Sequence, residues 1–446
     1  MSSTEKNGNS KPLDLTHNGY DKRLMRNVYV LSITMGIMTL FFGWQNYQSI
    51  YLQHGLGASY FDVGVVYSIG YLAHALSGFP ASLISDKHGR KKFVIAGTFI
   101  NGFVYMSYAL CNTWFLITIP LFVMNLSHAA YINPMFAMLA ESAPPKKRGI
   151  AFGAFQVISG VISLFAPLLA LSVISQYGQD PTVSVPLAMP YLYLMCGGTV
   201  AAMAVARGVA LRETHIGVLR LSQPLDITHT SQETDAAPLS NKTGTLRDCE
   251  EPRLRSRTVA GFFVFVSLAA ITSAVISNFI PLYAANVQVG NVHIFDNFRL
   301  MVFFVVSSGV STLVQLPTGR LADSSKKRIM LLISVLLFAL AILMYMIADD
   351  FYKFILAQAF LSAASTLLFN TEFTMISCYS RRRNRSTAFA IQTAIGDIVS
   401  IPFPLIGGLL ISVSPQLLFT FTLVLTVPTF FAGLLLVHEP SKPTAE

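Results

Sequence analysis

The chain has 446 residues, of which 53% are hydrophobic and 12% are charged, with a formal net charge of +9. A soluble domain carries about 25% charged residues, so this composition excludes an ordinary soluble protein. The four cysteines, Cys111, Cys196, Cys249 and Cys378, form no CxxC pair, which excludes a zinc or disulfide framework.

Apolar windows recur along the whole chain and predict a multi-pass membrane protein, because about 20 apolar residues span ~30 Å of hydrocarbon as a helix. Residues 1–23, which precede the first window, are polar and contain no apolar core with a small-residue cleavage site. They are expected to be a cytoplasmic tail and not a signal peptide. The twelve windows are approximately 28–50, 60–82, 93–111, 114–139, 150–174, 189–211, 259–283, 297–318, 329–348, 351–377, 387–411 and 416–437.

The positive charges predict the orientation of these spans. Of the 31 Lys and Arg residues, only Arg299 and Lys353 are expected on the side opposite the N-terminus. This asymmetry follows the positive-inside rule. It predicts two cytoplasmic termini and an even number of spans. The protein is expected in the plasma membrane. The basic charge therefore indicates orientation, and no nucleic-acid partner is expected.

An internal repeat divides the chain into two halves. Polar and charged residues of the first half recur 237 residues later, as in Asp86 and Asp323 or Asn133 and Asn370. The same spacing relates Arg148 to Arg385, Pro80 to Pro317 and Pro167 to Pro404. The predicted domains are an N-terminal six-helix bundle at 24–211, a central cytoplasmic loop at 212–257, a C-terminal six-helix bundle at 258–438 and a cytoplasmic tail at 439–446.

Three charged segments resemble motifs of the major facilitator superfamily. Residues 82–91, SLISDKHGRK, resemble its G-x-x-x-D-R/K-x-G-R-R/K turn, and residues 319–328, GRLADSSKKR, resemble a second copy. Residues 141–149, ESAPPKKRG, resemble its E-x-x-P-x-x-x-R-G turn. The resemblance covers residues 24–440. It implies an all-α membrane protein with twelve transmembrane helices in two homologous six-helix bundles.

The resemblance also implies a gating latch, in which Asp86 faces the start of the eleventh helix near Thr387 and is held by Arg90 and Arg148. Such a contact would form in one conformation and break in the other. The alternative is a set of solvated charges without a gating role, which is favoured for Lys87, Lys91 and Lys92. The residues expected in the latch are Asp86, Gly89, Arg90, Arg148, Asp323, Lys327 and Arg385.

Two acidic residues inside the apolar windows are candidates for proton coupling. Asp397 follows Arg385 by twelve residues, which places it ~18 Å along a helix. Glu372 precedes Arg381 by nine residues, or ~13 Å. An unpaired charge in the membrane costs ~2.5–3.5 kcal/mol, which a bound proton would relieve. The alternative is a structural acid beside a basic residue. Arg207 is expected to snorkel to the interface.

The resemblance implies a substrate path between the first, fourth, seventh and tenth helices. Tyr71 and His74 on the second helix share one face, as do Asn125 and His128 on the fourth. Amide and aromatic groups suit a neutral or weakly polar organic solute, and the alternative is hydrogen bonding between helices. The candidate cavity residues are Trp44, Gln45, Asn46, Asn125, His128, Asn133, Gln156, Asn278 and Asn370.

These features together predict a secondary active transporter that moves a small organic solute by alternating access with protons as the coupling ion. The stretch FPLIGG at 403–408 partly matches a drug–proton antiporter pattern, which slightly favours antiport. A proton symporter for a sugar, carboxylate or other metabolite stays open, and a non-transporting receptor is a remote alternative. The sequence contains no GxSxG, HExxH or P-loop pattern, so no enzyme is predicted. No cofactor or metal is expected, and the protein is expected to be a monomer in the lipid bilayer.

Overall fold

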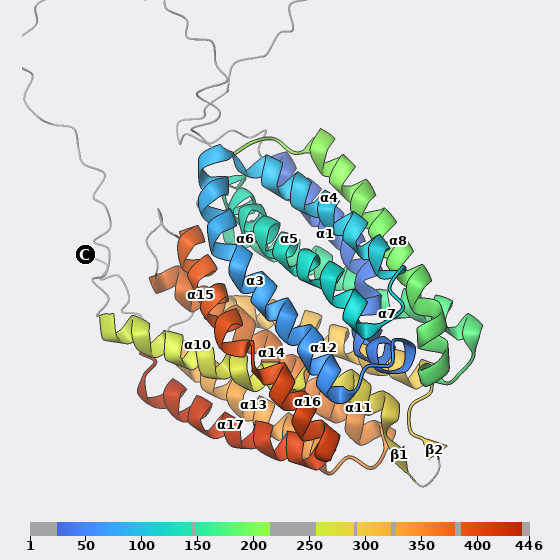
Figure 1. Cartoon of the computed structure of the whole chain (residues 1–446). Helices are drawn as coiled ribbons and strands as arrows, with labels where there is room; N and C mark the ends of the chain where they lie inside the picture. Colours follow the sequence, from blue (N-terminus) through green and yellow to red (C-terminus); the bar gives the residue numbers. More distant parts are fainter. Residues whose placement is uncertain are drawn as a thin grey trace, which may run out of the picture.

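The computed structural model describes residues 25–143, 148–214, 256–289, 292–322, 327–379 and 385–438. These residues are almost entirely helical and form two bundles that lie side by side (Figure 1). The N-terminal bundle consists of α1 (Met25–Phe41), η2 (Phe42–Tyr47), α2 (Gln48–Ile50), η3 (Tyr51–Gly55), α3 (Tyr60–His88), α4 (Arg90–Tyr108), α5 (Trp114–Glu141), α6 (Arg148–Ser163), α7 (Ala166–Ile174), η5 (Ser175–Tyr177) and α8 (Pro181–Ala210).

The C-terminal bundle repeats this arrangement. Its helices are α10 (Ser256–Ile276), α11 (Ile280–Asn286), α12 (Asn297–Ala322), α13 (Lys327–Met346), α14 (Phe351–Tyr379), α15 (Arg385–Ser400), α16 (Phe403–Val413) and α17 (Pro415–Leu435). A two-stranded antiparallel hairpin, which the sequence did not predict, joins α11 to α12 through β1 (Gln288–Val289) and β2 (Val292–His293).

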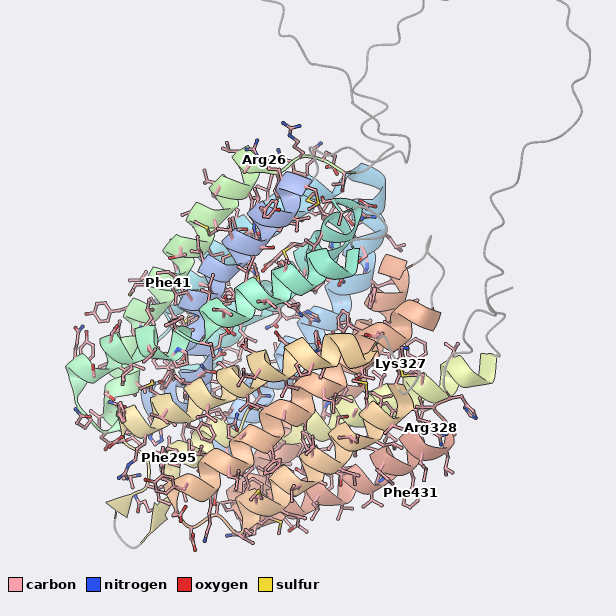
Figure 2. All side chains as sticks on the ribbon, turned by 180° about the vertical axis from the view of Figure 1, so that it is seen from behind. Arg26, Phe41, Phe295, Lys327, Arg328 and Phe431 are labelled. Atoms are coloured by element: carbon pink, nitrogen blue, oxygen red, sulfur yellow. The ribbon has the colours of Figure 1, made fainter. Side chains whose placement is uncertain are left out.

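The helices confirm the predicted all-α membrane fold. Ten helical segments among the described residues are long and apolar enough to cross a membrane, and α3 and α4 complete the twelve. We call the side where α1 begins and α17 ends the tail side, and the opposite side the far side. Figure 2 shows Arg26, Lys327 and Arg328 toward the tail side and Phe295 toward the far side.

Prolines break the helices at equivalent points in the two halves. Pro167 lies in the first turn of α7 and Pro404 in the first turn of α16. Proline is favoured there because its missing N–H would have no helical partner and its φ is already helical. Each fifth span is consequently two helices joined by a short kink, and the equivalent positions agree with the sequence repeat.

The charged segment between the second and third spans is mostly helical. We expected a charged turn, but α3 continues to His88 and α4 begins at Arg90. Gly89 alone makes the connection, with φ at +93°. A residue with a side chain adopts this conformation only at a cost, so glycine allows the chain to reverse in a single residue.

Two glycines allow the two bundles to pack backbone against backbone on α3 and α16. A Cβ atom on Gly64 would lie 2.4 Å from the carbonyl oxygen of Pro404, and one on Gly408 would lie 2.4 Å from that of Tyr60. Both distances are shorter than any real contact of a Cβ atom. The glycine pair therefore sets how closely the halves approach near the far side, where α3 runs beside α16 (Figure 1).

Hydrogen bonds also join the halves at the far side. The Asn286 amide on α11 donates to Gln53 Oε1 at 2.7 Å, and its oxygen lies 2.9 Å from His54 Nε2. Asn297, at the start of α12, donates to the Gly178 carbonyl oxygen at 2.8 Å and to Ser184 Oγ at 2.8 Å. Side chains of the C-terminal bundle thus hold loops and helix ends of the N-terminal bundle.

Arg207 does not snorkel, which corrects the prediction from the sequence. Its side chain on α8 is fully buried. Its Nε donates to Thr34 Oγ1 on α1 at 2.9 Å, and its Nη1 donates to Thr98 Oγ1 on α4 at 2.8 Å. The guanidinium group therefore joins three helices of the N-terminal bundle. The position of Arg207 in the sequence indicates its depth in the membrane, but it does not reveal the two hydroxyl groups on other helices.

We expect Thr98→Val to lower the free energy of unfolding by about 1–3 kcal/mol, because it leaves a buried guanidinium N–H without its acceptor. Thr98→Ser keeps a hydroxyl at the same place and is the matched control. Thermal unfolding of the purified protein in detergent would compare the two. Equal stability of the two variants would contradict a structural role for the Thr98–Arg207 bond.

Candidate functional site

A cavity of about 370 Å³ lies inside the C-terminal bundle. Its walls come from α10, α13, α14, α15 and α17, and one residue of α3, Tyr71, reaches it from the N-terminal bundle. Both predicted proton carriers, Glu372 on α14 and Asp397 on α15, line this cavity. Its volume is near the lower end of the range of small-molecule sites, about 300–1,000 Å³.

Asp397 contacts a histidine of the other bundle. Its Oδ2 lies 2.6 Å from Nδ1 of His74 on α3, and both side chains are mostly buried. The His128 ring on α5 lies 5.8 Å from the His74 ring, measured between centroids. Three titratable groups therefore form a row from the cavity wall into the N-terminal bundle, across the contact between α3 and α15.

Glu372 has a different environment from Asp397. Its Oε2 lies 3.5 Å from Nε2 of Gln392 on α15, a long contact for a hydrogen bond. No Lys, Arg or His pairs with Glu372 within the part of the chain that the structure describes. Gln392 is 7% exposed, and its Oε1 is buried without a hydrogen-bond partner among the same residues.

Trp44 lies in an aromatic cluster of the N-terminal bundle and not in the cavity. Its ring centroid is 5.5 Å from Tyr105, 6.0 Å from Tyr108 and 5.0 Å from Tyr193, all in edge-to-face geometry. Such contacts stabilise a packed core. The neighbouring Gln45 is exposed.

The predicted amide residues are distributed over several helix contacts and do not line the cavity. Asn125 donates to the Leu121 carbonyl oxygen at 2.9 Å, within its own helix. Asn370 donates to Thr318 Oγ1 at 2.8 Å, which joins α14 to α12. Asn133 Nδ2 is buried on α5 without a partner among the described residues. The half-buried side chains are Asn46, Gln156 and Asn278.

Arg90, one of the residues predicted for the latch, is described by the structure. It pairs with Glu141, an acid that was not predicted to be part of the latch. Arg90 Nη1 lies 2.8 Å from Glu141 Oε1 on α5. The backbone N–H groups of Arg90 and Lys91 each donate to a Glu213 carboxylate oxygen at 3.1 Å. Glu213 thus provides acceptors for N–H groups in the first turn of α4, which have no partner within the helix. Lys327 begins α13 with a buried side chain.

Apart from Gly89, the other residues predicted for the latch lie at positions that the structure does not describe in full. Asp323 lies outside the described residues. The side chains of Asp86, Arg148, Arg385 and Thr387 lie outside them as well. The contact that the resemblance implied between Asp86 and the eleventh helix therefore stays a prediction.

The site includes two residues that were not among the predicted site residues. The sequence places His74 on the same helix face as Tyr71, and it predicts no role for Gln392. An intramembrane His near the depth of an intramembrane Asp is a signal that could have suggested the pair. The sequence contains no comparable signal for Gln392, because its proximity to Glu372 depends on how α14 packs against α15.

Comparison with known proteins agrees with this architecture. The family model of the Major Facilitator Superfamily matches residues 30–308 and 262–446. An uncharacterized MFS-type transporter of Methanocaldococcus jannaschii is 30% identical over 129 residues, and the quinolone resistance protein NorA of Staphylococcus aureus is 25% identical over 126 residues. Each match covers 28% of this chain and only 32% of the relative.

Solved structures share the fold at low sequence identity. A bacterial homolog of the human lysosomal transporter Spinster, in an inward-facing and occupied conformation, has a TM-score of 0.66 at 12% identity. The alignment covers 92% of this chain and 95% of that one. The nucleoside transporter NupG also has a TM-score of 0.66 at 12% identity, over 92% of this chain and 100% of its own.

The twelve spans in two bundles define a multi-pass integral membrane protein. The chain belongs to the Major Facilitator Superfamily. This confirms the family predicted from the charged motifs.

Proposed function

We propose that this chain is a secondary active transporter that moves a small organic solute by alternating access, with protons as the coupling ion. The observation that carries the proposal is the contact between His74 and Asp397. It joins two titratable side chains, one from each bundle, at the cavity wall. The proposed transporting unit is the pair of bundles at 24–211 and 258–438, joined by segment 212–257. It is proposed to act as a monomer in the plasma membrane, with its tail side in the cytoplasm.

Proton binding at this pair would change the force between the halves. A carboxylate and an imidazole at 2.6 Å form a charge-assisted hydrogen bond, which is stronger than a neutral one. When the Asp397 carboxylate takes up a proton, this attraction between α3 and α15 weakens. A ligand that favours one protonation state then shifts the equilibrium between conformations, and this coupling is reciprocal.

The two bundles are in contact at the far side, and this closed side supports the proposal of alternating access. The Asn286 and Asn297 hydrogen bonds and the Gly64–Gly408 packing join the halves at the far side. For solute to cross from the far side, these contacts must separate. The contact of Asp397 with His74 lies midway along α3, so protonation of Asp397 would change how α3 moves relative to the far-side contacts.

We expect solute flux in proteoliposomes to depend on an imposed pH gradient. The purified protein would be tested with libraries of organic amines, carboxylates, sugars and nucleosides, with a fluorescent pH indicator inside the vesicles. Movement of solute against the proton flow would establish antiport, which we favour, and movement with it would establish symport. Binding without flux would favour a receptor, and flux that ignores the gradient would contradict proton coupling.

A further inference from the structure

We propose that the cavity in the C-terminal bundle is a binding site for a lipophilic organic cation that carries an aromatic or alkyl group. This inference rests on the proposed transport function and specifies its substrate class. It differs from the neutral solute that the amide residues of the sequence suggested, because the cavity has a different lining from the one predicted.

The charge of the cavity favours a cation. Two carboxyl groups, those of Glu372 and Asp397, line it, and none of the described lining residues is Lys, Arg or His. Asp397 already has His74 as a partner at 2.6 Å. Among the described residues, Glu372 has only the long contact with the Gln392 amide. A cationic solute would provide the opposite charge that a carboxylate in the membrane requires.

An unpaired acceptor points to the same ligand. Gln392 lines the cavity, and its Oε1 is buried and has no hydrogen-bond partner among the described residues. A buried acceptor without a donor is costly. An ammonium N–H or a polarised N–CH₃ group beside Glu372 would also reach this oxygen, whereas an anionic solute would meet two like-charged groups.

Aromatic rings of the cavity complete a site for a lipophilic cation. Phe369 and Phe373 are on the same helix as Glu372, with ring centroids 4.4 Å apart. Phe338 enters from α13 and Tyr71 from α3. Ring faces attract cations, and the attraction is strongest where water is excluded. The rings also bury the apolar part of a solute, so carboxylate and rings select charge and lipophilicity together.

Titration calorimetry with the full-length protein in detergent at one pH would test this site. The probes are benzyltrimethylammonium, whose charge cannot titrate, and benzylsulfonate, which has the same ring and the opposite charge. We expect benzyltrimethylammonium to bind and benzylsulfonate to bind at least about tenfold more weakly, a difference of about 1.4 kcal/mol. Equal affinities would overturn the cation site.

The variant Glu372→Gln should weaken binding of benzyltrimethylammonium by at least about tenfold. Asp349→Asn removes one acid at an exposed position, so it is the matched control and should retain full affinity. Retained affinity in Glu372→Gln, within about twofold, would exclude Glu372 as the cation's partner.

A second measurement on the unmodified protein covers the case in which Glu372→Gln does not fold. Dicyclohexylcarbodiimide modifies carboxyl groups in apolar sites, and mass spectrometry would locate the adduct. Benzyltrimethylammonium should protect Glu372 from modification, and benzylsulfonate should not. Absence of protection would contradict the site. Because neither test involves a pH gradient or flux, failure here would leave the proposed proton-coupled transport standing with another substrate.

Discussion

Asp397→Asn is expected to abolish the response of transport to a pH gradient, with flux reduced at least about tenfold toward background. An amide cannot take up or release a proton, so the exchange of a proton at the cavity wall would be lost. The side chain keeps the size and the hydrogen-bonding capacity of Asp397, whose Oδ2 lies 2.6 Å from His74 Nδ1. The variant should therefore fold and still hold α3 against α15.

Flux in proteoliposomes, with and without a pH gradient, would measure this effect. Asp349→Asn is again the matched control, because that acid is exposed and pairs with Lys353 at 2.6 Å on the far side. His74→Gln separates the two members of the pair, since it leaves the acid in place and should retain part of the pH response. Full coupling in Asp397→Asn would remove Asp397 from the mechanism, and Glu372 would be the next candidate.

Gly408→Val is expected to prevent the far side from closing. Even a Cβ atom at this position would lie 2.4 Å from the Tyr60 carbonyl oxygen, so α16 must move away from α3. Overpacking of this kind costs about 1–3 kcal/mol, which changes the ratio of two conformations by roughly 5–150-fold. The bonds of Asn286 to Gln53 and His54, which depend on the same approach, should be lost together.

Electron paramagnetic resonance distances would detect this opening. In a background without the native cysteines, spin labels would be attached at Leu110 and Val413, which are 76% and 75% exposed and lie on the far side of the two bundles. Labels at Val209 and Leu435 would report on the tail side. Gly208→Val is the control, because its nearest neighbour would be 4.0 Å away. An unchanged far-side distance would contradict the role of the glycine pair.

The two predictions separate coupling from packing. Asp397→Asn changes a protonation equilibrium and leaves the shape of the α3–α15 contact intact. Gly408→Val changes the shape of the α3–α16 contact and leaves every titratable group in place. A protein in which Gly408→Val opens the far side, and only Asp397→Asn removes the pH dependence of transport, would behave as the proposed mechanism requires.

Long-range patterns in the sequence were sufficient for the membrane fold. Apolar windows of about 20 residues leave few alternatives to spanning helices, because backbone polar groups need internal partners in lipid. The repeat relating Pro167 to Pro404 predicted two equivalent bundles, and the prolines break equivalent spans in the structure. The depth of Asp397 and Glu372 followed from helical rise alone.

Local charge patterns in the sequence were less informative about helix ends, because a single residue can decide where a helix stops. The segment around Asp86 reads as a charged turn, yet the helices continue to His88 and begin again at Arg90. Gly89 makes this possible through its positive φ. The prediction was wrong about the length of the turn because charge density in the sequence does not reveal where a helix ends.

By itself, the sequence determined the number of spans, the two-fold repeat, the family and the presence of two acids inside the membrane. Only the tertiary structure decided the partners of those acids. His74 and Asp397 are more than three hundred residues apart in the chain, and their contact depends on how α3 of one bundle packs against α15 of the other. Helical periodicity fixes which residues share a face, but the rotation and approach of two helices depend on side-chain shape and on close glycine contacts such as those of Gly64 and Gly408.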